Sequence, residues 1–478
     1  MAPFFSKITV ASFATFSFLL AMAHASPAKA LDTVVASQGD LFVKNLPANW
    51  SRSIGEWQYF DVVDCFTTPG SICYGSNPTS PYALPVFPSD DNGLPVKSFQ
   101  LKQNESIVLF FRTPPKTRYF AFTQYLFMTA GSSTTEFASL SDSLNNAQIG
   151  TSDLDGDMQP FNEYSVIVWS PDLGTRDRII AMLKAQGHPE TSINFIPMPV
   201  EIQKNSTNYR FSFGYGTASD QFTMLMRMAL PESQAELDNY IATNPFYVVK
   251  VGPEDGTPIP APTVGYKSEL TGVSESALFP NAEATLDRLT TDIKRQYGAQ
   301  FSFASSAVEY TEKTGWDCIL GEETCAGDNH DALYSRDTGV IRVKSLQDFV
   351  LVVGVNHQKT GKATYLNHSI YDLRKIAGIA GVADPELTSE SALYHAGIAP
   401  GSLKAKAYQN LYAYMIAYDC AGKSYCLEIP RPTPANPVGL EPGAPFLVVG
   451  RSYLEPRSLV RPAPSEVVKH RVFLATKR

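Results

Sequence analysis

The sequence predicts an α+β protein built from two related β-rich modules with a few helices. Three observations lead to this fold class. Short aromatic and β-branched runs outnumber helical patterns, a proline- and glycine-rich stretch divides the chain near its middle, and a block of residues in the first half recurs in the second. The 478 residues, 44% of them hydrophobic, are enough for two medium-sized cores.

The strand predictions rest on short apolar runs rich in aromatic and β-branched residues. The clearest candidates are SIVLFF (106–111), RYFAFTQYLF (118–127), YSVIVWS (164–170), DFVLVVGV (348–355) and LYAYMIAY (411–418). Helical patterns are rarer. Residues 172–187 begin with Asp172 as a candidate N-cap, and residues 280–298 begin at Pro280 and end at Gly298. Each half is therefore predicted to contain sheet with a few covering helices.

The stretch VGPEDGTPIPAPTVG, residues 251–265, separates the two predicted modules. It contains four prolines and three glycines, which disfavour both a helix and a central strand. Such a composition is typical of a linker or a long surface connection. We therefore place an N-terminal module at residues 31–250 and a C-terminal module at residues 266–478.

A cysteine-bounded block occurs once in each half. DCFTTPGSICYGSNPTSPY covers residues 64–82 and DCILGEETCAGDNHDALY covers residues 317–334, and both end in the pattern C-x-G-x-N-x-x-x-x-Y. Further along, a gapless alignment of two apolar segments at an offset of 243 pairs Lys116 with Lys359. This self-similarity predicts an internal duplication with the two modules packed about a pseudo-twofold axis. Similar turns that arose independently are the alternative.

The first thirty residues have the features of a secretory signal peptide. One lysine precedes an apolar run over residues 8–23, and small residues follow it in AHASPAKA. Because the run is short for a bilayer span, we expect residues 1–30 to be removed and no stable membrane span to remain. The protein is predicted to be secreted or to enter another extracytoplasmic compartment.

Cysteines and glycosylation sequons fit an exported protein. The six cysteines form close pairs that an oxidising compartment would join as local disulfides, Cys65 with Cys73, Cys318 with Cys325, and Cys420 with Cys426. Their separations are longer than those of zinc ligands. N-glycosylation is permitted by four sequons, at Asn49, Asn104, Asn205 and Asn367.

Charge argues against several classes of partner. The formal net charge is −8, and the chain has no run of five or more basic residues. Nucleic acids and anionic membrane surfaces attract basic patches, so we expect neither as a partner. A small-molecule ligand or substrate is the partner class that remains.

Three histidines distinguish the second copy of the repeat from the first. His330, His357 and His368 stand where the first copy has Pro78, Pro114 and Tyr125. His330 could serve as an acid or base with Asp331 orienting it, and His357 could do so with Lys359 stabilising negative charge. A divalent metal bound by His330, His357 and His368 is a further hypothesis, although their spacing matches no known metal motif.

Two functions fit these features. The leading hypothesis is an enzyme that acts on a small organic substrate through histidine acid–base or metal chemistry. The alternative is a secreted carbohydrate- or lipid-binding protein without catalysis, in which aromatic residues such as Tyr412, Tyr414 and Tyr418 would line the binding surface. The reaction stays open, because the sequence has no nucleophile elbow, zinc-protease motif, P-loop or dinucleotide fingerprint.

Overall fold

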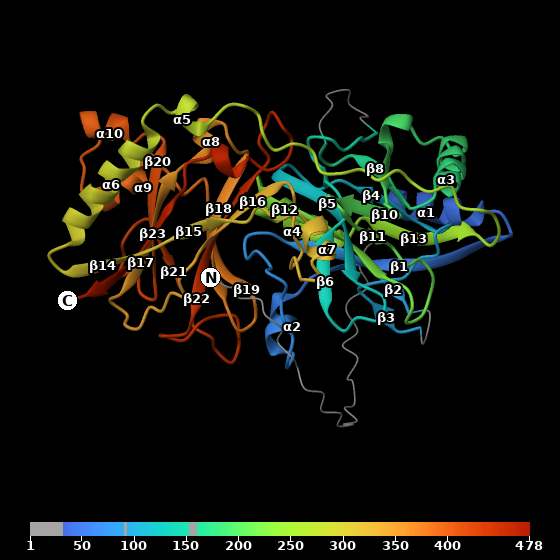
Figure 1. The fold of residues 1–478 in the computed structure, drawn as a ribbon, viewed down its shortest axis with the longest axis horizontal. Coiled ribbons are helices and arrows are strands. Elements are labelled where there is room, and N and C mark those ends of the chain that lie inside the picture. Colours follow the sequence, from blue (N-terminus) through green and yellow to red (C-terminus); the bar gives the residue numbers. More distant parts are fainter. Residues whose placement is uncertain (1–31, 90–92, 153–159) are drawn as a thin grey trace.

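The computed structural model describes residues 32–89, 93–152 and 160–478, so the predicted signal peptide lies outside the described residues. Within them the fold is α+β and rich in strands, with ten α-helices and twenty-three strands. The predicted fold class is confirmed at that level. Figure 1 shows the N-terminal half on one side and the C-terminal half on the other, with the chain crossing between them after β13 (Phe246–Pro253).

The N-terminal half comprises the described residues up to Pro253. Its strands are β1 (Trp50–Tyr59), β2 (Tyr82–Pro88), β3 (Pro95–Val96), β4 (Ser106–Arg112), β5 (Thr117–Met128), β6 (Thr135–Ser139), β7 (Leu144–Asn145), β8 (Tyr164–Ser170), β9 (Ile193–Pro197), β10 (Glu201–Lys204), β11 (Thr207–Arg210), β12 (Gln221–Pro231) and β13. Its α-helices are α1 (Thr33–Lys44), α2 (Val62–Thr67), α3 (Leu173–Ala185) and α4 (Gln234–Thr243).

The C-terminal half begins at α5, after the extended connection over residues 254–274. Its α-helices are α5 (Glu275–Leu278), α6 (Ala282–Tyr297), α7 (Gly315–Leu320), α8 (His357–Thr360), α9 (Ser389–Ala396) and α10 (Leu403–Ala407). Its strands are β14 (Phe301–Ser306), β15 (Val308–Tyr310), β16 (Ala332–Asp337), β17 (Phe349–Val355), β18 (Tyr365–Asp372), β19 (Ala377–Ala383), β20 (Leu411–Ala417), β21 (Cys426–Glu428), β22 (Phe446–Tyr453) and β23 (Arg471–Lys477).

Eleven of the thirteen N-terminal strands form one curled sheet, and β10 and β11 form a separate two-stranded sheet. The main path of the larger sheet runs β6-β5-β12-β2-β1-β13-β4-β8-β9. Neighbours are antiparallel except β8 and β9, which are parallel. The first part of β1 pairs with β13 and its last part pairs with β2, so this one long strand keeps the sheet continuous.

The C-terminal strands follow the same order in two separate sheets. One five-stranded sheet runs β19-β18-β22-β16-β15 and the other runs β14-β23-β17-β20-β21. Consecutive strands β14 and β15, separated only by residue 307, take the place that β1 occupies in the N-terminal half. The terminal pair β20 and β21 is parallel, as β8 and β9 are. A break in one strand therefore accounts for the division into two sheets.

Most predicted elements appear where the local patterns placed them. Helix α3 begins after Asp172, whose carboxylate accepts hydrogen bonds from two backbone N–H groups of the first turn. Helix α6 begins at Ala282 instead of at Pro280, because Asn281 takes a left-handed conformation and caps the helix. All three predicted disulfides are present. In the described ranges, no helix combines the length and the apolar character that a bilayer crossing requires.

Candidate functional site

The two cysteine-bounded blocks cross between the halves of the molecule. We call residues 62–82 the first loop and residues 315–334 the second loop, so that each loop includes one block and the whole of the short helix at its start. Each contains one short helix, α2 or α7, and one disulfide. In Figure 1, α7 lies among the strands of the N-terminal half, and α2 lies beneath β19. The region where the loops meet the opposite half is the junction.

The first loop is held against the C-terminal half by backbone hydrogen bonds. Cys73 N donates to Lys375 O over 2.7 Å, and Gly75 N donates to Ile376 O over 2.7 Å. The Cys65–Cys73 disulfide is buried. Part of the N-terminal chain thus continues the hydrogen bonding of the C-terminal half just before β19.

The second loop is anchored more deeply, in the core of the N-terminal half. Cys325 N donates to Glu136 O over 2.7 Å, next to β6. Trp316 belongs to the N-terminal apolar core together with Cys318, and its indole N–H donates to Leu140 O over 2.8 Å. A buried tryptophan with a satisfied N–H contributes both apolar burial and fixed orientation.

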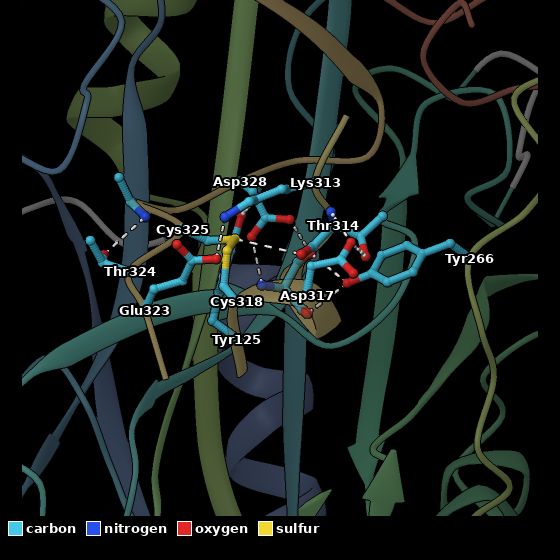
Figure 2. The surroundings of a disulfide bond; sticks show 12 residues. Tyr125, Tyr266, Lys313, Thr314, Asp317, Cys318, Glu323, Thr324, Cys325 and Asp328 are labelled. Carbon is cyan, nitrogen blue, oxygen red and sulfur yellow. Dashed lines mark hydrogen bonds and ion pairs between the residues drawn. A yellow bond between two sulfur atoms is a disulfide. The ribbon is translucent and has the colours of Figure 1, made fainter. Parts of the chain in front are cut away.

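Polar groups surround the second disulfide (Figure 2). Asp328 accepts hydrogen bonds from the backbone N–H and the hydroxyl of Ser139, over 2.7 and 2.6 Å, and its backbone oxygen accepts from the Tyr125 hydroxyl. Tyr266, in the connection between the halves, donates to Ser139 O. Burial raises the pKa of Asp328, and the Arg227 guanidinium opposes only part of that rise.

His330, a predicted site residue, lies between two carboxylates. Its Nδ1 is 2.7 Å from Asp142 and its Nε2 is 3.0 Å from Glu269. Burial alone would lower the pKa of His330, but Asp142 and Glu269 raise it above its usual value. Glu269 is also paired with Arg461. With both ring nitrogens engaged, His330 joins the N-terminal half, the connection and the second loop through charge-assisted hydrogen bonds.

Asp331, the neighbouring predicted residue, is a fully buried carboxyl group. Its Oδ2 accepts from the Tyr119 hydroxyl and from Asn145 Nδ2, each over 3.1 Å, whereas its Oδ1 has no hydrogen-bond partner among the described residues. Burial raises the pKa of Asp331 to about 7, against smaller opposing effects of Asn145 and Tyr119. This carboxyl therefore changes its protonation near neutral pH.

The other two predicted histidines lie in a second buried cluster, inside the C-terminal half. His357 Nδ1 is 2.7 Å from Glu275, and His368 Nε2 bonds to the Tyr412 hydroxyl. The rings of His368 and His470 are 4.6 Å apart. Burial, His470 and His357 lower the pKa of His368 well below its usual value. His357 thus acts on His368, and the hydrogen-bond partners of both differ from those of His330.

The remaining predictions concern Lys359 and a metal bound by the three histidines. Lys359 is exposed on α8, where its backbone N–H donates to the capping residue Asn356. Across residues 32–89, 93–152 and 160–478, no group of three or more His, Cys, Asp or Glu side chains is arranged to hold a metal ion. His330, His357 and His368 are each engaged with oxygen-bearing side chains of the protein.

Several residues of these clusters were missed from the sequence. Asp142 and Glu269 contact His330, Glu275 contacts His357, and His470 contacts His368. None of them stands near its partner in the chain or in a motif. The gapless alignment pairs Tyr365 with Phe122, so it contained no signal for Tyr119, although the hydroxyls of Tyr119 and Tyr365 each meet a crossing loop.

Comparisons with known proteins add little to this geometry. No protein-family model matches the chain, and no curated protein matches it. A solved structure of an uncharacterised protein from Burkholderia cenocepacia is 10% identical and aligns over 94% of this chain and 88% of that chain, with a TM-score of 0.38. The VPA0106 protein from Vibrio parahaemolyticus is 10% identical over 92% of this chain and 96% of that chain, with a TM-score of 0.35. Likeness at this level carries no conclusion about function.

Proposed function

We propose that this chain is an exported protein that binds a small polar organic molecule at the junction of its two modules. The supporting observation is a set of buried polar atoms there that have no hydrogen-bond partner within the part of the chain that the structure describes: Asp331 Oδ1, Ser76 Oγ and Asn367 Oδ1. Folded proteins rarely leave buried polar atoms unpaired, and a ligand or ordered water normally satisfies those that remain. These atoms come from the two crossing loops and from β18, so a ligand would contact both halves.

Export is supported by the sequence of residues 1–30 and by the three disulfides. Glycosylation is then expected at the exposed Asn49 and Asn205. It is not expected at Asn367, whose buried Nδ2 donates to Asn77, Thr79 and Tyr365. Glycopeptide mapping of the secreted protein tests this, and a glycan on Asn367 would contradict the description of the junction.

We also propose that the modules at residues 31–250 and 266–478 arose by duplication. Support comes from their common strand order and from the loops, which each dock on the opposite half. Lys116 lies between β4 and β5, and Lys359 lies between β17 and β18, the strands at the same places in that order. Superposition of the two halves tests the proposal, and it fails if these strand pairs do not coincide.

Ligand binding is tested on the full mature chain, secreted in oxidised form. Mass spectrometry under native and denaturing conditions should detect a small molecule released on unfolding. A thermal-shift screen with sugars, acids and amides should identify compounds that stabilise the protein. The Asp331→Asn variant should respond differently to those compounds, whereas Asp337→Asn, a buried carboxyl at the far end of β16, should respond as the wild type does. If no molecule is released and no compound stabilises the protein, the binding proposal is wrong.

An enzyme remains the second candidate. The observation in its favour is Asp331, a buried carboxyl with a free oxygen whose pKa of about 7 suits proton transfer near neutral pH. His330, His357 and Lys359 keep their predicted roles as part of this proposal. The enzyme hypothesis includes a version in which the histidines bind a metal, and elemental analysis of the wild type and of His357→Ala tests that version. A metal that is stoichiometric in the wild type and lost in the variant would favour it.

A further inference from the structure

Two buried arginines occupy matching positions in the two halves. Arg227 lies in β12 and Arg451 lies in β22, strands that hold the same place in the order of their sheets. Each guanidinium donates to a backbone oxygen of the loop that crosses from the other half. Arg227 Nη2 is 2.6 Å from Gly327 O, and Arg451 Nη2 is 3.0 Å from Gly75 O. The arginines therefore sit on the two sides of the junction.

The positive charge of this pair is poorly compensated. Arg227 is 3% exposed and Arg451 is 4% exposed, and no carboxylate in the described part of the chain forms an ion pair with either. Asp328 offsets part of the charge of Arg227, but burial raises its pKa. The groups that act most on Arg451 are tyrosines. A buried charge without a partner is costly, so an opposite charge is expected nearby.

Tyrosine rings surround the two cations without neutralising them. Arg227 lies over the rings of Tyr82 and Tyr125, at 5.6 and 5.5 Å. Arg451 lies over Tyr334 and Tyr371, at 5.3 and 5.1 Å. Cation–π contacts orient a guanidinium but leave its net charge in place. Tyr82 and Tyr334 are only half-buried, so the cluster adjoins solvent on their side.

Arg451 also has hydrogen-bond donors to spare. Its Nη2 donates to Gly75 O and to the Tyr371 hydroxyl, while Nε and Nη1 are buried and have no partner in residues 32–89, 93–152 and 160–478. Nε carries one hydrogen and Nη1 carries two, so three N–H donors of this side chain are available to an acceptor. Unpaired donors on an unpaired cation are the arrangement that an anionic oxygen group satisfies best.

We infer that the Arg227–Arg451 pair binds the anionic oxygen group, a carboxylate or a phosphate, of a small organic molecule at the junction. This inference rests on the proposed binding function and specifies the charge of the ligand. Arg451 supplies the free hydrogen-bond donors, and Arg227 adds positive potential from the other half. Because the loops that carry Gly75 and Gly327 meet this pair, the bound anion would also hold the two halves together.

The inference is tested by titrating the full oxidised chain with sodium acetate, sodium benzoate and inorganic phosphate at constant ionic strength. Benzamide serves as the uncharged analogue of benzoate. Calorimetry and thermal unfolding should show saturable binding of at least one anion, and benzamide should bind much more weakly. Saturation by the carboxylates alone assigns a carboxylate ligand, and saturation by phosphate alone assigns a phosphate.

Arg451→Gln removes the charge and should weaken anion binding about ten-fold or more. The matched control Arg457→Gln makes the same change of charge at an exposed guanidinium and should bind as the wild type does. If Arg451→Gln does not fold, Arg451→Lys keeps the charge but lacks Nε and Nη1, and the same weakening is expected from it.

Two results would overturn the inference. One is the absence of saturable anion binding to the wild type, and the other is binding that is equal in the wild type and the Arg451 variants. If uncharged compounds still bind in an Asp331-dependent manner, the proposed function survives and only the ligand charge is wrong. If neither class binds, both proposals fail.

Discussion

The two crossing loops share a scaffold but differ in one chemical group. In the first loop, the Thr79 hydroxyl meets the Tyr365 hydroxyl over 3.0 Å. At the corresponding place in the second loop, the Asp331 carboxylate accepts from the Tyr119 hydroxyl over 3.1 Å. Each loop carries a buried asparagine two positions earlier in the chain, Asn77 or Asn329, and each asparagine has its own hydrogen-bond partners.

This difference places a titratable group in only one of two similar loops. A threonine at the junction is neutral at every pH. An aspartic acid there ionises only when the pH is high enough to offset the free energy of burying its charge. The second loop also carries His330 with its two carboxylates, where the first has Pro78. The titratable groups of the junction are therefore concentrated around the second loop.

The loops also differ in how deeply they are anchored, and this predicts the largest effect. Trp316 of the second loop is 9% exposed in the N-terminal core, whereas Phe66 of the first loop is half-buried. Trp316→Ala should lower the free energy of unfolding by about 3 to 5 kcal/mol. Phe66→Ala should cost clearly less, because less apolar surface is lost. Urea denaturation of both variants checks the order, and equal losses would contradict it.

Asp331 should make the free energy of unfolding depend on pH, whereas Thr79 should not. The pKa of Asp331 rises from its ordinary value of 3.8 to about 7 in the folded protein. Between these values the unfolded state releases the proton while the folded state retains it. Asp331 should therefore make the free energy of unfolding fall as pH rises from 4 to 7, by roughly 4 kcal/mol at most, and its contribution should then level off.

Asp331→Asn should remove this contribution, because the amide does not titrate and its oxygen can still accept from Tyr119. The fall that comes from Asp337, whose pKa burial also raises to about 7, should remain in the variant. Thr79→Asp should introduce a similar fall on the first loop. Chemical denaturation at pH 4, 5.5, 7 and 8 measures both variants against the wild type. If the slope of Asp331→Asn equals that of the wild type, another group titrates and the assignment to Asp331 is wrong.

The disulfides of the two loops should have similar and moderate effects. The sequence separations of their cysteines are 8 and 7 residues. Replacing either pair by serine should cost about 2 to 3 kcal/mol in the chain-entropy account. The Cys420–Cys426 disulfide, with a separation of 6, lies within the C-terminal half and is the control. Limited proteolysis should show loosening of the junction for the first two pairs only, and loosening by the third would contradict this account.

The lysines of the repeat should have the smallest effect on stability. Lys116 and Lys359 are both exposed, and Lys116 forms a surface ion pair with Glu232. Replacement of either by alanine should change the free energy of unfolding by less than about 0.5 kcal/mol. A loss of more than 1 kcal/mol in either variant would show that the exposed position has a structural role. If a substrate is found, the activity of Lys359→Ala tests the predicted role of Lys359, because this variant is expected to be as stable as the wild type.

The self-similarity of the two halves was visible in the sequence, but the register of the matching strands was only partly predictable. The offset of 243 relates β4 to β17 residue by residue. It pairs Phe122 with Tyr365, whereas the hydrogen bonds to the crossing loops place Tyr119 and Tyr365 in corresponding roles. The connection that contains α8 is longer than its counterpart, and a gapless alignment cannot detect this difference.

The sequence by itself determined the strands, the main helices and the three disulfides. These features depend on residues close together in the chain, through side-chain periodicity, capping and short loops. Only the tertiary structure decided that each loop docks on the opposite half and that His330 meets Asp142, 188 residues away, and Glu269, 61 residues away. Such contacts depend on how the sheets curl and pack. Many carboxylates far from His330 in the chain have similar local sequences, so local patterns do not show which of them will reach it. The partners of a buried histidine, and with them its pKa, therefore follow from the packing of the two halves.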